Sequence, residues 1–194
     1  DPEAAQRALD EAGWTMPAQG LYRSQHGVDF IVELVAADAY PYREVARVLP
    51  RQLAAVGVGV RLNIVPAGQL VTKYLGARSY QMALASLDNG PDPDQFSFWH
   101  SSEAAYPLNF SDLPRQSFID KDLEDGRAAI EMKDRIAAYG DLQDLLVDAA
   151  PAFFLYEPHY WYAVNRRIGG VHANSVIDAL DRFQYVTDWY AVSG

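Results

Sequence analysis

Acidic and amide side chains gather in one short turn, where they could bind a cation or act as a pair of carboxylates. Asp88 and Asn89 follow a short apolar run at residues 81–87, and a rigid stretch of Gly and Pro residues comes next. A buried strand that ends in a carboxylate before such a turn is how α/β sheets present binding groups. In a closed cleft, a carboxylate forms charge-assisted hydrogen bonds with an ammonium group. We therefore take Asp88 and Asn89 as candidate ligand-binding residues, with a turn cap as the alternative role for Asp88.

Two further carboxylates, Asp92 and Asp94, flank Pro93 and precede an aromatic segment. This pattern favours helix capping over ligand binding. A calcium loop is not expected, because the prolines break the fixed spacing of oxygen ligands that such a loop needs. A hydrolase that uses Asp88 with Asp92 or Asp94 as acid and base remains an alternative function. The sequence contains no serine nucleophile elbow, P-loop or dinucleotide fingerprint.

Three more side chains are candidate ligand contacts. Asp38 and Tyr40 lie on the loop after the first predicted strand and, by the rule for parallel sheets, face the same crevice as Asp88. The alternative for this loop is exposure to solvent. His100 could bond to a ligand, or its segment could anchor a loop in the core together with Trp99. The four histidines are scattered without the spacing of metal ligands, so we predict no metal site and no cofactor.

Length and composition describe a globular protein and narrow its partners. The chain has 194 residues, of which 49% are hydrophobic and 22% charged, and its formal net charge is -10. A nucleic-acid partner is not expected, because phosphate binding needs a basic face. The sequence has no cysteine, which excludes disulfides and thiolate chemistry. It has no apolar run of transmembrane length, and its first residues carry no signal core, so either a signal lies outside this sequence or the protein is cytoplasmic.

The elements that position the candidate residues alternate between strands and helices. Apolar periodicity predicts strands at 28–36, 58–65 and 81–87, separated by helices at 42–56 and 66–77. A proline inside the first of these helices, Pro50, predicts a kink or a break. Strand, helix and strand with short connections predict a parallel, right-handed unit.

The second half of the chain is less regular. Residues 101–128 are polar and rich in Ser, Asp and Pro, so only short helices are expected there. Helical spacing of apolar residues predicts a long helix at 129–149. The aromatic run 152–164 predicts a bent strand, an edge strand or two strands, because Pro158 interrupts it. Together these elements predict one α/β domain over residues 1–194, with a mixed sheet flanked by helices and an aromatic tail that fits a neighbouring lobe.

Several stretches resemble, in order and spacing, the second lobe of the family 5 extracellular solute-binding proteins, which are the peptide, dipeptide and nickel receptors of ABC importers. These stretches are DPEAA and AGW within 1–14, QLAAVGV at 52–58, DNGPDPDQF at 88–96, YGDLQDLLVDAAP at 139–151, FLY at 154–156 and YAV at 162–164. The resemblance runs nearly from end to end of the chain.

This resemblance implies a receptor of two lobes that clamps a solute in a cleft by hinge closure and performs no chemistry. Residues 1–194 would be the second lobe, with 171–194 as a return segment toward the first. The implied ligand is an oligopeptide or a related small solute whose amino terminus pairs with Asp88. The implied partners are the membrane permease subunits of an ABC importer. A periplasmic or extracellular, membrane-associated monomer is expected, with no nucleic-acid partner.

The chain departs from the family pattern at two places. Ala85 stands where members often carry a Trp, three residues before the aspartate. Ala36 and Asp38 stand where some dipeptide receptors carry an Arg-x-Tyr that holds the ligand carboxylate. The resemblance therefore does not imply a dipeptide ligand. A sensor domain that reuses the same fold is a further alternative function.

Overall fold

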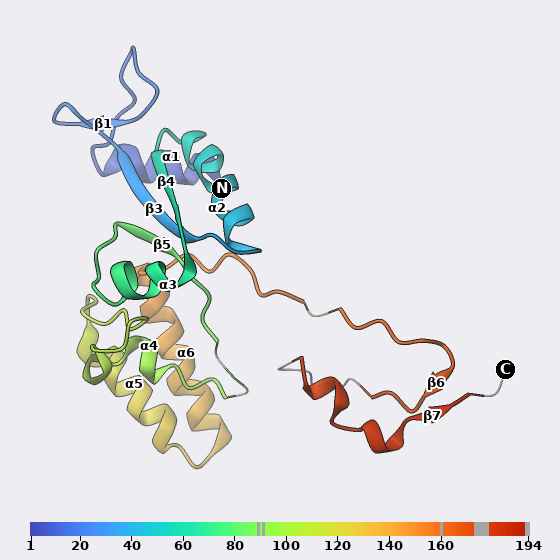
Figure 1. Ribbon diagram of the computed structural model, residues 1–194. Coiled ribbons are helices and arrows are strands. Elements are labelled where there is room, and N and C mark those ends of the chain that lie inside the picture. Colours follow the sequence, from blue (N-terminus) through green and yellow to red (C-terminus); the bar gives the residue numbers. More distant parts are fainter. Residues whose placement is uncertain (89, 91, 160, 173–178, 193–194) are drawn as a thin grey trace. The chain divides into compact units, whose positions relative to one another are not determined.

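The computed structural model describes residues 1–88, 90, 92–159, 161–172 and 179–192. The chain divides into two compact units, drawn in Figure 1. The first, here called the sheet unit, comprises Asp1–Asp88 and Phe96–Asp112. The second, the helical unit, comprises Asn89–Gln95 and Leu113–Gly194.

The sheet unit is built on three parallel strands in the order β4-β3-β5. The central strand β3 (Ile31–Ala37) pairs with β4 (Gly59–Val65) along its whole length and with β5 (Met82–Leu84) at its carboxyl end. Helix α2 (Tyr42–Ala54) connects β3 to β4. The predicted strand–helix–strand unit with parallel strands is therefore confirmed, although β5 is shorter than the strand predicted at 81–87.

Helix α2 contacts both β3 and β4, and its Ala46 is fully buried. Pro50 lies inside this helix, where we predicted a kink or a break. The break is wrong, because the helix continues to Ala54. A proline removes one helical hydrogen bond, here the one to the carbonyl of Ala46, and leaves the rest of the ladder in place.

A compact core lies where the π-helix η1 (Leu70–Leu75), which follows α3 (Ala67–Gln69), packs on the sheet. Its buried members come from the strands and from η1: Val35, Ala37, Val65, Leu70 and Leu75. Tyr42 and Tyr74 are partly buried against this core. The side chains of Leu70 and Leu75 thus face the core, as the apolar spacing in the helix predicted at 66–77 requires.

A buried arginine joins the N-terminal helix α1 (Pro2–Glu11) to the rest of the sheet unit. Arg23 precedes the hairpin of β1 (Ser24–Gln25) and β2 (Val28–Asp29). It donates to the carbonyls of Trp14 and Val56 over 2.6 and 2.8 Å, and to the carboxylate of Asp10 over 2.5 Å. These bonds hold α1, the hairpin and the end of α2 together. Asp1 caps α1, because its carboxylate accepts from the N–H of Ala4 over 2.9 Å.

The sheet unit is completed by α4 (Phe96–Trp99) and the 3-10 turn η2 (Ser101–Glu103). Trp99 is buried, and its ring centroid lies 5.5 Å from that of Phe110. The expectation that Trp99 anchors this segment in a core is confirmed.

The helical unit is built on α5 (Gln116–Ala128) and α6 (Met132–Ala149), which pack against each other. Helix α6 confirms the long helix predicted at 129–149. Helix α5 was expected only as short irregular helices, because its charged residues hide a narrow stripe of three buried positions, Ile119, Leu123 and Gly126. The ring of Tyr139 lies so close to Gly126 that an added Cβ would meet its atoms at 2.8 Å. A glycine therefore lets the two helices approach.

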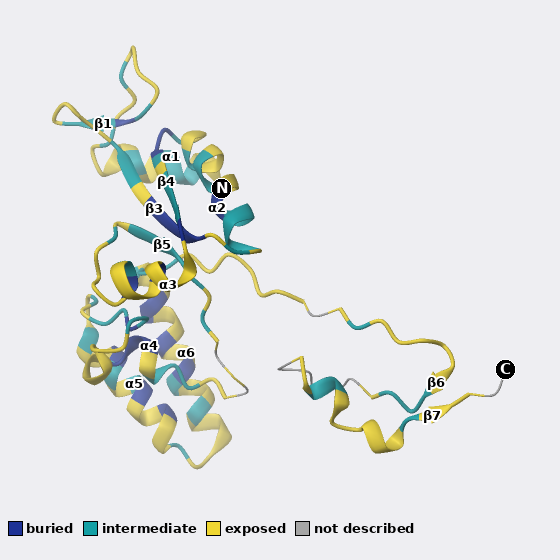
Figure 2. Cartoon of the chain, viewed as in Figure 1, coloured by how far each residue is buried: buried dark blue, intermediate teal, exposed yellow. Residues whose placement is uncertain are grey.

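The predicted strand or strands at 152–164 are wrong for the residues described there, 152–159 and 161–164, which form no helix or strand. Large apolar side chains stand exposed along this stretch, among them Phe153 (80%) and Trp161 (88%). Much of the chain that follows α6 has the yellow of exposed residues in Figure 2. Aromatic residues favour strands only where a neighbouring strand supplies hydrogen bonds and packing. Farther on, β6 (Ile168–Gly169) and β7 (Tyr190–Ala191) pair antiparallel, with the 3-10 turns η3 (Asp181–Phe183) and η4 (Val186–Asp188) before β7. Within the part of the chain that is described, no helix has the length and apolar character to span a bilayer.

Candidate ligand-binding site

The carboxyl ends of three parallel strands meet at one edge of the sheet in the sheet unit. The register sets Ala36 opposite Leu84 and Ala37 opposite Val65, so the residues that follow β3, β4 and β5 leave the sheet together (Figure 1). Asp38 and Asp88 both follow strands that end here. Carboxyl edges of parallel sheets are where α/β proteins bind ligands. The sequence rule thus placed Asp38, Tyr40 and Asp88 on segments that leave the same edge.

Asp38 is fixed at this edge by its backbone and by an ion pair. Its N–H donates to the carbonyl of Val65 over 2.7 Å. Its Oδ1 accepts from Nη1 of Arg43 over 2.8 Å, and Nε of Arg43 lies 3.1 Å from a carboxylate oxygen of Glu44. The hydrogen bond that Arg43 donates to Asp38 is the largest cause that raises the pKa of Arg43, followed by the one that it donates to Glu44. A ligand cation at Asp38 would therefore share this carboxylate with Arg43.

Two aromatic residues stand at the start of α2, next to Asp38. Tyr40 is 82% exposed and joined to Pro41 by a cis peptide bond. The hydroxyl of Tyr42 lies 2.9 Å from the hydroxyl of Ser86, which follows β5. This hydrogen bond ties the chain that leaves β5 to the helix that follows β3. Sequence reasoning missed Ser86, although the predicted pairing of these strands was a signal that could have found it.

Asp88 is exposed, four residues past the end of β5 rather than directly at a strand end. Its position still follows a strand that leaves the carboxyl edge. Asn89 lies outside the described residues. The role of this pair as ligand contacts therefore stays a prediction.

His100 is buried and caps the turn that follows it. Its Nδ1 accepts from the N–H of Ser102 over 3.0 Å and lies 2.8 Å from that residue's hydroxyl. Its ring stacks on Phe96 with centroids 3.8 Å apart. The structure thus gives His100 a capping and packing role in the loop after α4, and its contact with a ligand stays a prediction.

Asn109, which sequence reasoning did not single out, fixes the loop after α4 by hydrogen bonds. It is fully buried, and its amide donates to the carbonyls of Ser97 and His100 over 3.1 and 2.9 Å. Its side-chain oxygen accepts from the N–H of Ser111 over 3.0 Å. Nη1 of Arg78 donates to its backbone carbonyl over 2.6 Å. Spacing along the chain carries no signal for such a residue, because its partners come from several turns of the fold.

The carboxylates of Asp92 and Asp94, in the helical unit, are each engaged by an arginine. Oδ1 of Asp92 accepts from Nη2 of Arg135 over 2.5 Å and from the N–H of Asp94 over 2.9 Å. Oδ2 of Asp94 accepts from Nε of Arg127 over 2.6 Å. Sequence reasoning missed both arginines. Carboxylates that are ion-paired with arginine are poorly suited to act as the acid and base of a hydrolase.

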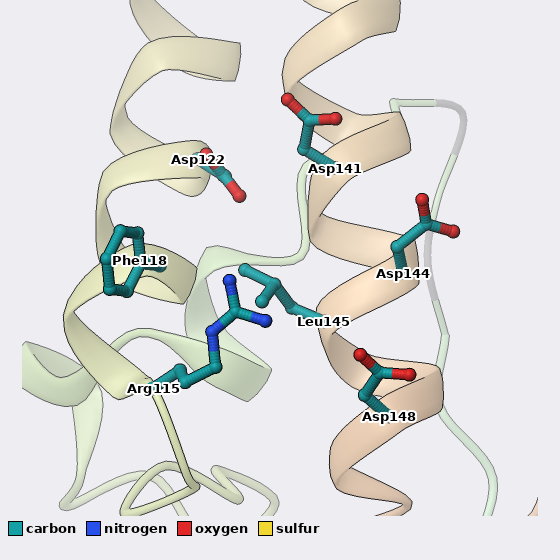
Figure 3. A pocket seen from close by; sticks show the side chains of 7 residues that line it. All are labelled: Arg115, Phe118, Asp122, Asp141, Asp144, Leu145 and Asp148. Atoms are coloured by element: carbon teal, nitrogen blue, oxygen red, sulfur yellow. The ribbon is translucent and has the colours of Figure 1, made fainter.

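A groove of about 280 Å³ between α5 and α6 collects further acidic side chains, shown in Figure 3. Asp122 on α5 faces Asp141 on α6, and burial, followed by the charge of Asp141, raises the pKa of Asp122. The guanidinium of Arg115 lies 5.3 Å from the ring centroid of Phe118, at the start of α5. Within the described residues, no group of three or more His, Asp or Glu is arranged to hold a metal ion.

The sequence model of the bacterial extracellular solute-binding proteins, family 5 Middle, matches residues 1–107. The chain belongs to this family. The predicted resemblance is thereby confirmed. A family relative, the oligopeptide-binding protein AppA of Bacillus subtilis (strain 168), is 24% identical over 168 residues, which are 86% of this chain and 31% of that protein. The chain thus spans about a third of the length of this curated relative.

Solved structures of related proteins share the fold. AppA from Bacillus subtilis, in complex with a nonapeptide, superposes with a TM-score of 0.72 at 21% identity, over 100% of this chain and 38% of that one. NikA from Brucella suis, in complex with Fe(III)-EDTA, gives 0.63 at 28% identity, over 77% of this chain and 30% of that one. Lactococcal OppA, with an endogenous peptide in the closed conformation, gives 0.65 at 24% identity over 78% and 29%. The predicted α/β fold, like a lobe of a periplasmic binding protein, is confirmed.

Proposed function

We propose that this chain is the ligand-clamping lobe of a solute receptor for an ABC importer. It binds oligopeptides or related small solutes at the carboxyl edge of its sheet and catalyses no reaction. Membership of the family 5 solute-binding proteins supports this function. The observation that carries it is the edge itself, where Asp38, Tyr40 and Asp88 leave neighbouring parallel strands.

The ligand chemistry of this edge is that of a cation with an apolar neighbour. Asp38 and Asp88 are carboxylates, and Tyr40 offers an exposed ring. A peptide amino terminus satisfies both features when an apolar side chain accompanies it. Relatives bind a range of solutes: AppA was solved with a nonapeptide, NikA with Fe(III)-EDTA and MelB with stachyose. The proposed peptide ligand therefore rests on the carboxylates of this chain as well as on the family.

The rest of the receptor supplies the other half of the cleft. The chain covers 31% of its curated relative, which supports the proposal that residues 1–194 are one lobe of a longer receptor. The exposed aromatic residues beyond residue 150 fit a segment that packs on that other part, and 171–194 would return toward it. Closure of the two lobes around the solute would present the receptor to permease subunits. A monomer outside the cytoplasm, associated with the membrane and without a nucleic-acid partner, completes the proposal.

Thermal unfolding of the full-length receptor tests this function against a panel of di- to pentapeptides, sugars and nickel chelates. A ligand that binds only the native state raises the melting temperature by mass action. At a concentration of one hundred times its Kd, it adds about 2.7 kcal/mol to the free energy of unfolding. We expect a rise with peptides that is reduced in Asp88→Ala and retained in Asp29→Ala, which removes an exposed carboxylate of β2.

Two other results would change the assignment. If no solute shifts the melting temperature of a folded protein that is free of retained ligand, the proposed receptor function is wrong and a sensor domain is favoured. If a peptide is cleaved, and cleavage is lost in Asp88→Asn, the hydrolase alternative is favoured. Product analysis by mass spectrometry after incubation with each peptide separates the second case from simple binding.

A further inference from the structure

Arg43 lies in the first turn of α2, at the carboxyl edge of the sheet, and bonds two carboxylates at once. Its Nη1 donates to Oδ1 of Asp38 over 2.8 Å, and its Nε donates to Oε1 of Glu44 over 3.1 Å. All three side chains are partly exposed, so a ligand at this edge can reach them. Two carboxylates and one guanidinium leave one negative charge, which a single cationic group of a ligand would neutralise.

Glu44 has an acceptor that is not in use. Its second carboxylate oxygen, Oε2, is buried and has no hydrogen-bond partner among the described residues. Buried polar atoms normally have partners, so this oxygen needs an explanation. A guanidinium presents Nε–H and one Nη–H side by side, in a geometry that matches the two oxygens of one carboxylate. Because Arg43 already bonds Oε1, a rotation of its guanidinium would bring a second donor to Oε2, and no ligand atom has to reach this buried oxygen.

Asp38 is the partner that Arg43 can release. The backbone N–H of Asp38 donates to the carbonyl of Val65, so the residue stays at the end of β3 whatever its side chain bonds. If a ligand cation takes the carboxylate of Asp38, Arg43 can hold Glu44 through two bonds instead of one, and every charge has a partner. A ligand carboxylate gains nothing from the same exchange, because it would draw Arg43 away from Asp38 and Glu44 and leave both without a cation.

We propose that Arg43 is a specificity-determining residue of the ligand site: it holds Asp38 in the free receptor and yields it to a basic side chain of the bound peptide, while Glu44 retains the guanidinium. This inference rests on the proposed function and names the class of peptide, which carries a basic residue in addition to its amino terminus. Asp88 keeps its proposed role as partner of that amino terminus. Glu44 acts through Arg43 and is a positioning residue.

Isothermal titration of the full-length receptor with alanine pentapeptides tests this preference. Each peptide carries one lysine, at positions two to five in turn, and its control carries norleucine, an uncharged side chain of similar length, at the same position. At one position the lysine peptide should bind about fivefold more tightly, as a partly exposed ion pair allows.

Two neighbouring substitutions should change this lysine preference in opposite directions. Arg43→Gln should raise it about threefold, because Asp38 no longer has to be released. Glu44→Gln should lower it, because Arg43 then depends on Asp38 alone. Arg47→Gln is the matched control: it removes an equal charge from an exposed position one turn further along α2 and should leave the preference unchanged within twofold.

The double variant separates this exchange from the general attraction between charges, whose effects add for independent sites. In the Arg43→Gln background, Glu44→Gln should no longer change the lysine preference. The inference is overturned if no position prefers lysine, if Arg43→Gln raises the preference no more than Arg47→Gln, or if the two substitutions are additive. Tight binding of the norleucine peptides would still support the receptor in those cases, whereas a folded receptor that binds no peptide would overturn the proposed peptide ligand and this inference with it.

Discussion

The hydroxyl oxygens of Tyr42 and Ser86 lie 2.9 Å apart and join the first turn of α2 to the chain that leaves β5. This is a side-chain hydrogen bond between two of the segments that leave the carboxyl edge of the sheet. It constrains the residues that lead to Asp88, while the ion pair with Arg43 constrains Asp38. The proposed ligand contacts are thus held by pairs that sequence spacing alone does not reveal.

Removing the Tyr42–Ser86 bond should affect binding more than folding. The pair is exposed, so Tyr42→Phe and Ser86→Ala should each cost about 0–1 kcal/mol of stability. Both should weaken the peptide affinity of the full-length receptor, because the segment before Asp88 loses its tie. Isothermal titration of the two single variants and the double variant measures this as a cycle. If the two losses of affinity add fully, the bond does not act as a unit and the prediction fails.

Two glycines on neighbouring helices should respond in opposite ways to the same substitution. A Cβ at Gly126 would meet ring atoms of Tyr139 at 2.8 Å, whereas one at Gly140 would meet nothing within 4 Å. Gly126→Ala should therefore destabilise by about 1–3 kcal/mol through overpacking, despite the gain in helix propensity. Gly140→Ala should stabilise by about 0.5–1 kcal/mol. Urea unfolding measures both changes, and equal effects would contradict the packing of Tyr139 on Gly126.

Sequence reasoning reached the α/β fold where local signals agreed with one another. The clean alternation at 58–65, the preceding helix and the strand at 28–36 together indicated parallel strands, and the structure pairs them so. It failed where the secondary structure depends on a tertiary contact. Helix α5 was hidden because its apolar stripe is only three residues wide and includes Gly126, whose packing on Tyr139 no local pattern shows. The aromatic run 152–164 satisfied strand propensity, but the described chain gives those residues no partner strand.

The candidate site divides in the same way. The rule for parallel sheets predicted from strand order alone that Asp38, Tyr40 and Asp88 lie on segments that leave one edge of the sheet, and their contact with a ligand stays a prediction. Their partners depend on how side chains meet across the fold, so Arg43 and Ser86 could not be assigned in advance. From the sequence, His100 could bind a ligand or anchor a loop, and its bond with Ser102 became visible only with the backbone of the following turn.

Asn109 should be among the most sensitive polar residues of the sheet unit. Its buried side chain bonds the carbonyls of Ser97 and His100 and the N–H of Ser111. Asn109→Ala would therefore leave the buried carbonyl of His100 and two partly buried groups without this partner. A loss of about 2–4 kcal/mol is expected in urea unfolding. Asn63→Ala is the matched control, because its partly buried amide donates to the exposed Glu33 and to the hydroxyl of Tyr74. A loss at Asn109 no larger than that at Asn63 would contradict this.

The acidic groove between α5 and α6 should make stability depend on pH through Asp122. Burial and the charge of Asp141 raise the pKa of Asp122 in the folded state above its unfolded value, which is about 3.9. The charged form is therefore unfavourable in the native protein, and this cost is fully present above the folded pKa. As pH falls through the folded pKa, the native state takes up the proton first and the cost disappears. Asp122→Asn should consequently raise the melting temperature at pH 7. The gain in the free energy of unfolding should be less than about 1 kcal/mol, because the groove is open to solvent.

The difference in melting temperature between Asp122→Asn and the unaltered protein should shrink on acidification. It should vanish below about pH 3.9, where Asp122 is protonated in both the folded and the unfolded protein. Thermal melts of the two proteins from pH 7 to pH 3 measure it. Added salt separates the two causes, since it screens the repulsion from Asp141 but not the effect of burial. Because burial is the larger cause, most of the difference at pH 7 should persist at high salt. A difference that is independent of pH, or that grows toward acid, would show that the substitution acts through packing and not through the charge of Asp122.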